Sequence, residues 1–406
     1  MTAMEKKDKN LNVPNLRFPE FSGEWEIHKL SEYLDFKNGL NPDAKRFGRG
    51  LPFISVMDIL AARVICYDNI RAKVEATDKE IECFGVNKGD LLFQRSSETF
   101  EDVGRANVYM DNRTAIYGGF VIRGRKIGNY DPLFFKYLLA TPLARKRTCR
   151  MGAGAQHFNI GQEGLSKISL HFPSIEEQSK IANLFSLIDE RVETQKKIIE
   201  DLKKLKYAIS KQVFAHEPIN WDRLDTLFSK GKAGGTPTST NKEFYNGDIP
   251  FLSINDITKQ GKYIRYTDNH LSQSGLENSS AWIVPQHSLI MSMYASVGLV
   301  TINEVPITTS QAMFAMQLKD KDLLDYLYYY LLYFKHRHIH EYLETGTQSN
   351  INADIVRGIM IPDYGRSLNL QIASTLQIID AKIDNELAIL EQFNSQKNYL
   401  LSQMFI

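Results

Sequence analysis

The sequence has few cysteines and lacks long apolar runs. Cys66, Cys83 and Cys149 are the three cysteines, and no two of them form a Cys-x-x-Cys pair. This spacing argues against a disulfide framework and against a zinc knuckle. The chain contains no run of about 18 apolar residues, and its first ten residues lack the apolar region of a signal peptide. We therefore expect a cytoplasmic protein that has no contact with a membrane.

Motifs that would indicate catalysis, a metal or a cofactor are also missing. His336 and His340 would share one face of a helix, but no third ligand stands at a suitable spacing. The glycine-rich stretch 152–155 lacks the Lys-Ser/Thr pair of a phosphate-binding loop. No Ser-His-Asp or Cys-His set stands out either, although such sets scatter along a sequence. We expect a chain without catalytic residues, metal or bound cofactor.

The chain also lacks a strong charge of either sign, with a net charge of +1. Read globally, this balance argues against a nucleic-acid partner. The charge is unevenly distributed, however: residues 1–173 hold 26 Lys and Arg against 21 Asp and Glu, and residues 218–362 hold 12 against 14. A local basic surface in the first half therefore remains open.

The sequence contains an internal repeat of two similar copies. The block Pro52–Ile59, PFISVMDI, recurs as Pro250–Ile257, PFLSINDI. Trp25 and Trp221 precede the two copies, and shorter matches follow them. The offset between copies drifts from 196 to 192 and then stays at 191. Small loop insertions would produce such a drift, so we infer two similar lobes.

Each copy ends in a heptad pattern, with apolar residues in strict 4-3 alternation. The seam positions are Ile181, Phe185, Ile188, Val192, Ile199, Leu202, Ile209 and Val213 in the first copy, and Ile372, Leu376, Ile379, Ile383, Leu390, Phe393, Leu400 and Met404 in the second. Polar residues interrupt both seams at the same places, Gln195 with Glu386 and Lys206 with Lys397.

The heptads predict two helices of about 35–40 residues, on the order of 50–60 Å long. Each helix could simply pack on its own globular core. The matching interruptions favour a mutual antiparallel coiled coil. A pseudo-twofold register would then place Lys206 opposite Glu386 and Gln195 opposite Lys397.

The remaining segments mix short β-branched runs with Gly, Asn and Pro, which indicates an α+β (mixed α/β) fold. Each lobe also has one helical stretch near its end, around 132–150 and 321–343. We expect a flexible tail at 1–14, a first lobe at 15–173, a central long helix at 174–217, a second lobe at 218–362 and a distal long helix at 363–406.

This organisation resembles the specificity subunits of type I restriction-modification systems, the HsdS family, over essentially the whole chain. The motifs that carry the resemblance are Leu16-Arg17-Phe18-Pro19 with Trp25, Gly234-Gly235-Thr236-Pro237, Gly247–Phe251, the exit Phe172–Gln178, and the helix ends Gln212-Val213-Phe214 and Gln403-Met404-Phe405. One departure is visible. The second exit, at 362–369, lacks the Glu-Gln pair and is predicted to carry about four extra residues.

The resemblance implies a function. Each lobe would be a target recognition domain reading one half of a bipartite site in double-stranded DNA, and the paired helices would be a spacer. That spacer would also dock two methyltransferase (modification) subunits and, through them, restriction/motor subunits. S-adenosylmethionine and ATP would belong to these partners. Because the lobes differ in sequence, the site should be asymmetric.

Base recognition needs side chains with paired donors and acceptors, whereas Lys and Arg bind phosphates. In the first lobe the candidates are Lys45, Arg46, Arg49, Gln94, Arg95, Ser96, Arg105, Gln156, His157 and Asn159. In the second lobe they are Lys230, Lys232, Thr236, Thr238, Asn241, Lys242, Ser292, Tyr294, Gln348, Ser349 and Asn350. Gln348–Asn350 are aligned with Gln156–Phe158. A further basic group is predicted to contact phosphates or to be solvated: Arg123, Arg125, Lys126, Arg145, Lys146, Arg147 and Arg150.

Two other classes of function remain open. One is a non-catalytic coiled-coil scaffold that never touches DNA. The other is the recognition half of a fused restriction-methylation enzyme, although the repeat leaves no room within these residues for a methyltransferase or nuclease domain.

Overall fold

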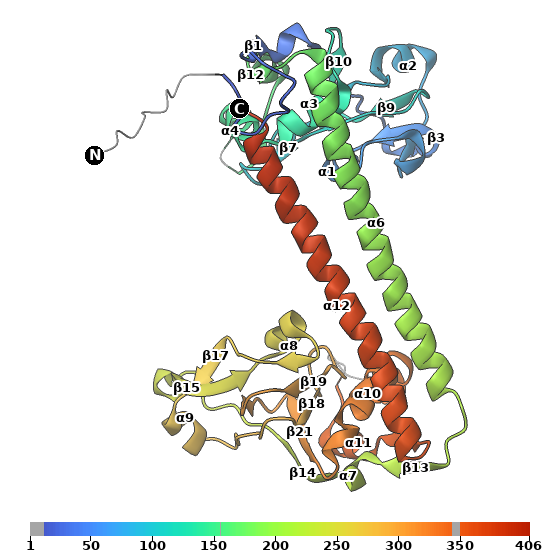
Figure 1. The fold of residues 1–406 in the computed structure, drawn as a ribbon, viewed down its shortest axis with the longest axis vertical. Helices are drawn as coiled ribbons and strands as arrows, with labels where there is room; N and C mark the ends of the chain where they lie inside the picture. The colour runs from blue at the N-terminus through green and yellow to red at the C-terminus, as the bar shows by residue number, and fades with distance from the viewer. Residues whose placement is uncertain (1–11, 155, 343–349) are drawn as a thin grey trace. The chain divides into compact units, whose positions relative to one another are not determined.

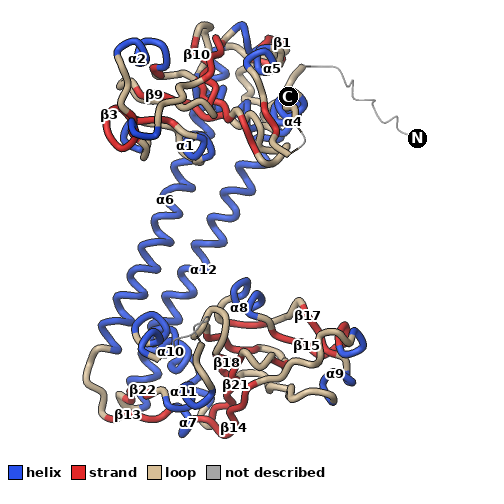
Figure 2. Tube along the Cα trace, turned by 180° about the vertical axis from the view of Figure 1, so that it is seen from behind, coloured by secondary structure: helices blue, strands red, loops and turns tan. Residues whose placement is uncertain are grey.

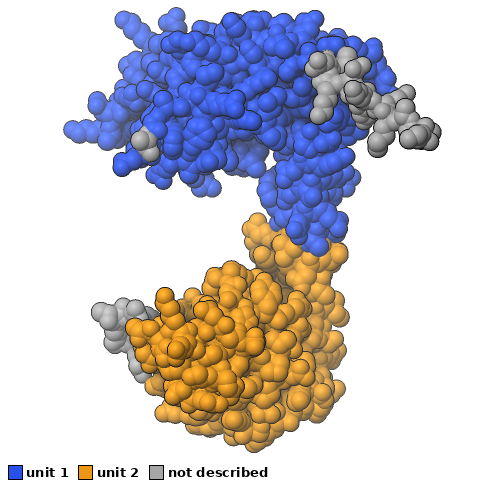
Figure 3. Space-filling view, turned by 90° about the vertical axis from the view of Figure 1, so that its left-hand side faces the viewer, with its two compact units in different colours: residues 1–196, 388–406 blue, residues 197–387 orange. Residues whose placement is uncertain are grey.

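The computed structural model describes residues 12–154, 156–342 and 350–406. The chain divides into two compact units (Figure 3). Unit 1 comprises Met1–Lys196 with Ala388–Ile406, and unit 2 comprises Lys197–Leu387. Each unit holds one lobe and one segment of each long helix. A lobe therefore shares its compact unit with both helices, instead of forming a unit separate from them.

The elements up to the first long helix, which continues from unit 1 into unit 2 after Lys196, are short (Figures 1 and 2). The strands are β1 (Glu26–Lys29), β2 (Leu34–Asn38), β3 (Phe47–Ile54), β4 (Lys73–Val74), β5 (Gly85–Val86), β6 (Leu91–Gln94), β7 (Ser96–Ser97), β8 (Ala106–Val108), β9 (Ala115–Tyr117), β10 (Val121–Lys126), β11 (Phe158–Asn159) and β12 (Ser169–Phe172). The α-helices are α1 (Val56–Leu60), α2 (Asp78–Phe84), α3 (Pro132–Ala140), α4 (Pro142–Arg150), α5 (Gln162–Ser166) and α6 (Ile175–Phe214), and the 3-10 helices are η1 (Leu30–Glu32), η2 (Ala44–Arg46) and η3 (Tyr67–Asn69).

Unit 2 repeats this plan. Its strands are β13 (Asn220–Arg223), β14 (Phe228–Ala233), β15 (Tyr245–Leu252), β16 (Tyr263–Ile264), β17 (Asn269–Leu271), β18 (Leu289–Ser292), β19 (Val300–Asn303), β20 (Thr308–Thr309), β21 (Met313–Leu318) and β22 (Met360–Asp363). Its α-helices are α7 (Leu224–Leu227), α8 (Ile254–Gln260), α9 (Gln273–Glu277), α10 (Leu324–Arg337), α11 (Ala353–Gly358) and α12 (Arg366–Gln403), and its 3-10 helices are η4 (Lys242–Phe244), η5 (Lys321–Leu323) and η6 (Ile339–Glu341).

The two lobes share one topology. The main sheet has the order β2-β10-β6-β8 in the first lobe and β14-β21-β18-β19, extended by β16, in the second. A second sheet contains a parallel pair, β3 with β9 in one lobe and β15 with β20 in the other. Antiparallel pairs β1-β12 and β13-β22 join the start of each lobe to its end. This topology confirms the internal repeat and the mixed α/β fold.

The repeated PFISVMDI and PFLSINDI blocks form the same local structure. In each block a buried strand end is followed by a serine N-cap and then by a short helix. Ser55 and Asp58 make a reciprocal capping box, and Ser253 and Asp256 make the equivalent one. The sequence folds this way because the cap residues satisfy backbone groups that the first helical turn leaves unpaired.

The helical stretch predicted at 132–150 is two helices, because Thr141 ends α3 and caps α4 just before Pro142. The repeated tryptophans also differ. Trp25 is buried and packs edge-on against Phe134 and Phe405, whereas Trp221 is largely exposed.

Two long helices are present as predicted, α6 with 40 residues and α12 with 38. All twenty seam and interruption positions are buried or half-buried. In unit 1, Phe185 packs on Phe405 and Asp189 pairs with Lys397. In unit 2, Lys206 pairs with Asp380, and Tyr364 donates to the carbonyl of His216. Within each unit the helices are therefore antiparallel.

The predicted polar register is wrong by six residues. Lys206 pairs with Asp380 at 2.5 Å and not with Glu386, which pairs with Lys382 on its own helix. Lys397 forms its ion pair with Asp189. Apolar heptads allow several registers, and here the partners are aspartates one position outside the seam.

The extra residues predicted at the second exit are also absent. In both lobes the long helix begins three residues after the last strand ends, at Ile175 and at Arg366. At the first exit Arg17 forms a bidentate pair with the carboxylate of Glu177, at 2.8 and 2.7 Å. At the second exit Asn369 donates to Asp363 at 2.8 Å.

Candidate nucleic-acid interface

Two of the predicted loops in the first lobe meet through their side chains. Ser96 lies on β7 and Asn159 on β11, and these strands pair antiparallel. The Ser96 hydroxyl donates to Oδ1 of Asn159, and the Asn159 amide donates to the carbonyl of His157 at 3.2 Å. Residues 63 positions apart therefore form one polar surface, which offers both donors and acceptors to a base edge.

Arg95 joins a third loop to this surface. Its backbone N–H donates to the carbonyl of Phe120 at 2.9 Å, and its guanidinium donates to the carbonyl of Gly119 at 3.3 Å. Its own carbonyl accepts from Ile160 at 2.9 Å. The arginine head is held half-buried at the junction of the three loops. Four of its five N–H groups are in principle available for an acceptor pair such as that of guanine.

Gln94 lies below this surface, with only 5% of the residue exposed. Its amide donates to the carbonyl of Ser96 at 2.9 Å, and its Oε1 has no hydrogen-bond partner among the described residues. Arg105, Gln156 and His157 are exposed on the flanking loops, where Arg105 pairs with Asp102 at 2.6 Å. In this conformation Gln94 supports the loop from below, and the exposed residues form its rim.

The Lys45 to Arg49 cluster lies on η2 and β3. Arg46 forms an ion pair with Glu80 and donates to the carbonyl of Glu75 at 2.9 Å. This hydrogen-bonded guanidinium lowers the pKa of Glu80 to about 2. Arg49 pairs with Glu75 at 2.7 Å. A phosphate would have to compete with two carboxylates at Arg46 and Arg49, whereas Lys45 is exposed and forms no ion pair among the described residues.

The further basic group is corrected in part. Arg123 is buried and donates to the carbonyl of Gly85, and burial lowers its pKa. Arg145 donates to the carbonyl of Val103 at 2.6 Å, and Arg147 donates to that of Ser169. All three guanidiniums donate to backbone carbonyls of the fold, and Arg123 is buried, whereas Arg145 and Arg147 are half-buried.

An apolar cleft beside Arg95 was missed by the sequence reasoning. It has a volume of about 390 Å³, and its lining includes Met57, which is 77% exposed, and Phe120, which is 69% exposed. Phe47 and Phe53 close it from β3. The contributing segments are scattered over 80 residues, so no local pattern could reveal it. Exposed aromatic and thioether side chains suit contact with base faces or thymine methyl groups.

In the second lobe the predicted lysines lie along β14. The ammonium of Lys230 stands over the Trp282 ring at 4.3 Å, and Lys232 donates to the carbonyl of Ser280 at 3.4 Å. Thr236 and Thr238 follow on an exposed loop, and the exposed Lys242 begins η4. Asn241 is used as the N-cap of η4, accepting from the N–H of Glu243 at 3.1 Å.

The second and third loops of this lobe also meet. Met293 donates its N–H to the carbonyl of Ala312 at 2.7 Å and accepts from the N–H of Ile351 at 3.0 Å. These are the bonds that Arg95 makes in the first lobe. Ile351 is thus the counterpart of Ile160, and Asn350 corresponds to Asn159. The predicted match of Gln348–Asn350 with Gln156–Phe158 is wrong by one position.

Ser292 is fully buried, so it does not reach the surface in this structure. Its hydroxyl donates to the carbonyl of Ser296 at 2.8 Å and accepts from the N–H of Leu299 at 2.9 Å. Tyr294 is exposed on the same turn, and Asn350 is half-buried. Gln348 and Ser349 lie outside the described residues.

Within residues 12–154, 156–342 and 350–406, no group of three or more His, Cys, Asp and Glu side chains is arranged to hold a metal ion. His336 lies in α10, which ends at Arg337, and His340 lies in the separate helix η6. Over the same residues, no helix combines the length and apolar character that crossing a membrane requires.

A family model for the type I restriction modification DNA specificity domain matches residues 22–204 and again residues 218–395. The chain belongs to this family. The two matches coincide with the two copies found in the sequence and in the topology. The chain is therefore a specificity subunit of the type I restriction-modification class, with two recognition domains.

Similar proteins carry the same description. A putative type I restriction enzyme MjaX specificity subunit of Methanocaldococcus jannaschii is 23% identical over 421 residues, covering 97% of this chain and 96% of the relative. The MjaIX specificity subunit of the same organism is 27% identical over 175 residues, 42% of this chain and 40% of that relative. The chain thus spans less than half of the second relative and nearly all of the first.

Solved structures agree on the fold. The type I restriction-modification S subunit of M. genitalium gives a TM-score of 0.60 at 14% identity, covering 97% of this chain and 99% of that one. A chain from work on complex assembly and conformational transition of the type I R-M system gives 0.61 at 14% identity, covering 94% and 97%. These similarities support the two-lobed fold with long helices.

Proposed function

We propose that this specificity subunit reads a bipartite, asymmetric site in double-stranded DNA, with one half-site for each lobe. One observation carries the proposal: both lobes bring three loops together by the same backbone bonds but present different side chains there. Arg95 occupies the junction in the first lobe and Met293 occupies it in the second. A shared scaffold with different surface groups suits a protein that reads two different short sequences.

We divide the polar and basic candidates into base-reading residues and phosphate contacts. Arg95, Ser96 and Asn159 are the proposed base-reading group of the first lobe, and Lys45, Arg105 and Lys242 are proposed phosphate contacts. Phosphate contacts give affinity without sequence information, whereas a bidentate base contact discriminates by about 1–3 kcal/mol. The apolar cleft at Phe120 adds contact area beside the reading group.

We further propose that the chain has no catalytic activity and docks two methyltransferase subunits, which in turn recruit restriction subunits. S-adenosylmethionine and ATP would bind to those partners, in the cytoplasm. Leu187 on α6 and Ile378 on α12 support two equivalent docking surfaces. They are 61% and 68% exposed and stand 191 positions apart, the repeat offset. Exposed apolar residues at repeated positions suit two copies of one partner.

A methylome tests the function directly. A host without adenine methylation would express this chain with a cognate methyltransferase subunit. The expected result is one bipartite motif with a methyladenine in each half, absent when this chain is omitted. If the complex assembles but no motif appears, a coiled-coil scaffold becomes the better reading.

Two further measurements test the partners. The purified chain with S-adenosylmethionine should transfer no methyl group to DNA, and clear activity would support a fused enzyme instead. Leu187→Ser should reduce the mass of the assembled complex by one methyltransferase, as should Ile378→Ser. Lys203→Ser, an exposed position on α6, is the matched control and should leave the mass unchanged.

A further inference from the structure

A single aspartate in unit 1 joins three elements of the fold. Asp189 of α6 forms an ion pair with Lys397 of α12. Its other carboxylate oxygen accepts from the hydroxyl of Tyr137 on α3, at 2.9 Å. Tyr137 is almost fully buried, and burial raises its pKa, so the hydroxyl stays protonated as a donor. Both long helices and α3 therefore meet at one carboxylate.

Unit 2 contains the same arrangement. Asp380 of α12 accepts from Lys206 of α6 at 2.5 Å and from the hydroxyl of Tyr329 on α10 at 2.8 Å. Tyr329 is also almost fully buried, with a raised pKa. The ammonium of Lys206 stands 5.0 Å from the centre of the same ring. We call the two sets, Asp189-Lys397-Tyr137 and Asp380-Lys206-Tyr329, the anchors.

The anchors are related by the internal repeat. Asp189 corresponds to Asp380 and Lys206 to Lys397 at the offset of 191, and Tyr137 corresponds to Tyr329 at 192. The role of each helix is exchanged between units, since α6 supplies the aspartate in unit 1 and the lysine in unit 2. All three residue types and all the bonds are thus retained in two copies whose loop residues differ.

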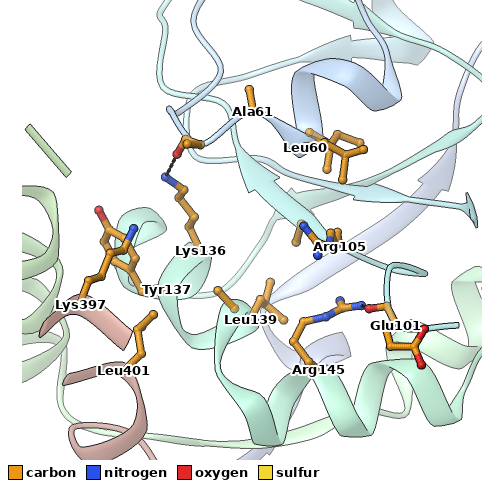
Figure 4. A pocket seen from close by; sticks show the side chains of 14 residues that line it. Leu60, Ala61, Glu101, Arg105, Lys136, Tyr137, Leu139, Arg145, Lys397 and Leu401 are labelled. Carbon is orange, nitrogen blue, oxygen red and sulfur yellow. Dashed lines mark hydrogen bonds between the residues drawn. The ribbon is translucent and has the colours of Figure 1, made fainter. Parts of the chain in front are cut away.

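A second lysine lies beside each anchor, but the two lysines stand at non-equivalent positions of the repeat. In unit 1 it is Lys136 of α3, which donates to the carbonyl of Ala62 at 3.0 Å and lies 3.7 Å from Asp189. Figure 4 shows Lys136 and Tyr137 beside Lys397, along the wall of a cavity of about 380 Å³. In unit 2 it is Lys262, 2.6 Å from Asp325 and donating to the Tyr329 hydroxyl at 3.0 Å. Both units therefore have a second ammonium group near the anchor, although the lysines that supply it are not equivalent in the repeat.

Stability alone does not account for the anchors. Partly buried ion pairs contribute little net stability, because desolvation offsets the attraction. They do fix geometry: an apolar seam tolerates rotation or a shift, whereas a carboxylate with a donor on each oxygen accepts one arrangement. The anchors therefore fix where each lobe's helix stands against α6 and α12.

We propose that Tyr137 and Tyr329, with their aspartates, are positioning residues that set the length of the gap between the two half-sites. The inference rests on the proposed function, because a gap exists only if each lobe reads one half-site. A lobe whose orientation on α6 and α12 varies would bind its half-site at more than one distance from the other half-site. The anchors act on gap length through the aspartates and do not touch DNA.

The test is the gap length in the methylomes of Tyr137→Phe, Tyr329→Phe and the double variant, each expressed with the cognate methyltransferase. Methylation at sites whose gap differs by one base pair from the wild-type gap should rise about tenfold relative to wild-type sites. Both half-site sequences should stay unchanged. Each single variant is measured by itself, so the test stands even if the double variant does not fold.

Tyr130→Phe and Tyr326→Phe are the matched controls. Both tyrosines are buried, and their hydroxyls donate to the backbone carbonyls of Gly89 and Pro362, not to an aspartate of the long helices. They should lower the melting temperature comparably and leave the gap unchanged.

Two results would overturn the inference by itself: a defined wild-type gap that stays unchanged in the anchor variants, or equal relaxation in the controls. A wild-type chain that directs no bipartite methylation would overturn the proposed function, and this inference with it.

Discussion

The two lobes keep their strand order and their capping boxes but differ at the loop junction. In the first lobe the junction carries Arg95, with Phe120 and Met57 beside it. The equivalent positions in the second lobe are Met293, Ala312 and Asn255, as the shared backbone bonds and the Ser55 and Ser253 caps establish. The first lobe is apolar and cationic there, and the second is neutral.

The comparison of the two lobes indicates which residues the fold requires. Residue types are retained at the anchors, where Tyr137 and Tyr329 donate to aspartates inside the protein. They change where a side chain faces outward from the same backbone, as at Phe120 and Ala312. The retained set holds the scaffold, and the changed set contains the side chains proposed to read DNA.

The largest effect on stability is expected at the seam of the two long helices, which the two units share. Phe185→Ala should lower the free energy of unfolding by about 3–5 kcal/mol, and the equivalent Leu376→Ala by about 2–5 kcal/mol, because both side chains are fully buried. Denaturant unfolding measures both. Leu187→Ala on the same helix is exposed and should cost about 0.5 kcal/mol or less. Equal costs at positions 185 and 187 would contradict the seam.

Arg95→Ala tests the junction itself. Loss of a bidentate base contact should weaken binding by about 1–3 kcal/mol and relax one base pair of the first half-site only. Competition binding with a library of sites provides the measurement. Lys88→Ala, an exposed cation in the same lobe, is the control. Uniform weakening across all sequences would identify Arg95 as a phosphate contact.

The apolar cleft can be tested by exchanging the residue types at positions 120 and 312, which are equivalent in the two lobes. Phe120→Ala should weaken recognition of the first half-site by about 1 kcal/mol, and Ala312→Phe should alter the second half-site. Because Phe120 is 69% exposed, its removal should leave the melting temperature nearly unchanged. A large loss of stability with unchanged half-sites would make Phe120 a packing residue.

The smallest effect concerns an ion pair present only in the first of the two lobes, over the described residues. Glu80 pairs with Arg46, whereas the equivalent position after the Ser272 cap is Gly275. The folded pKa of Glu80, about 2, lies below its ordinary value of 4.5. The pair therefore stabilises the fold above pH 4.5, and this contribution is lost as the pH falls toward 2.

Glu80→Gln should accordingly lower the melting temperature slightly at pH 6 and have no effect near pH 2. Thermal unfolding across this range measures the difference. Glu243→Gln, an exposed carboxylate in the second lobe, is the control. A difference that grows toward acid pH would contradict the assigned pKa.

The repeat, the two long helices, the seam and the capping boxes could all be predicted from the amino-acid sequence. These features depend on residues close together in the chain or on a period repeated many times, so local physics specifies them. The family resemblance also rested on such blocks. The predicted lobe boundaries and DNA contacts stay predictions.

The helix register, the burial of Arg123 and Ser292, the ion pair of Arg46 with Glu80 and the cleft at Phe120 became visible only in the folded chain. Each depends on segments far apart in the chain. A heptad seam is nearly unchanged by a shift of several residues, so the pattern could not select a register. That choice was made by Asp189 and Asp380, which lie outside the seam and are held by tyrosines from the lobes.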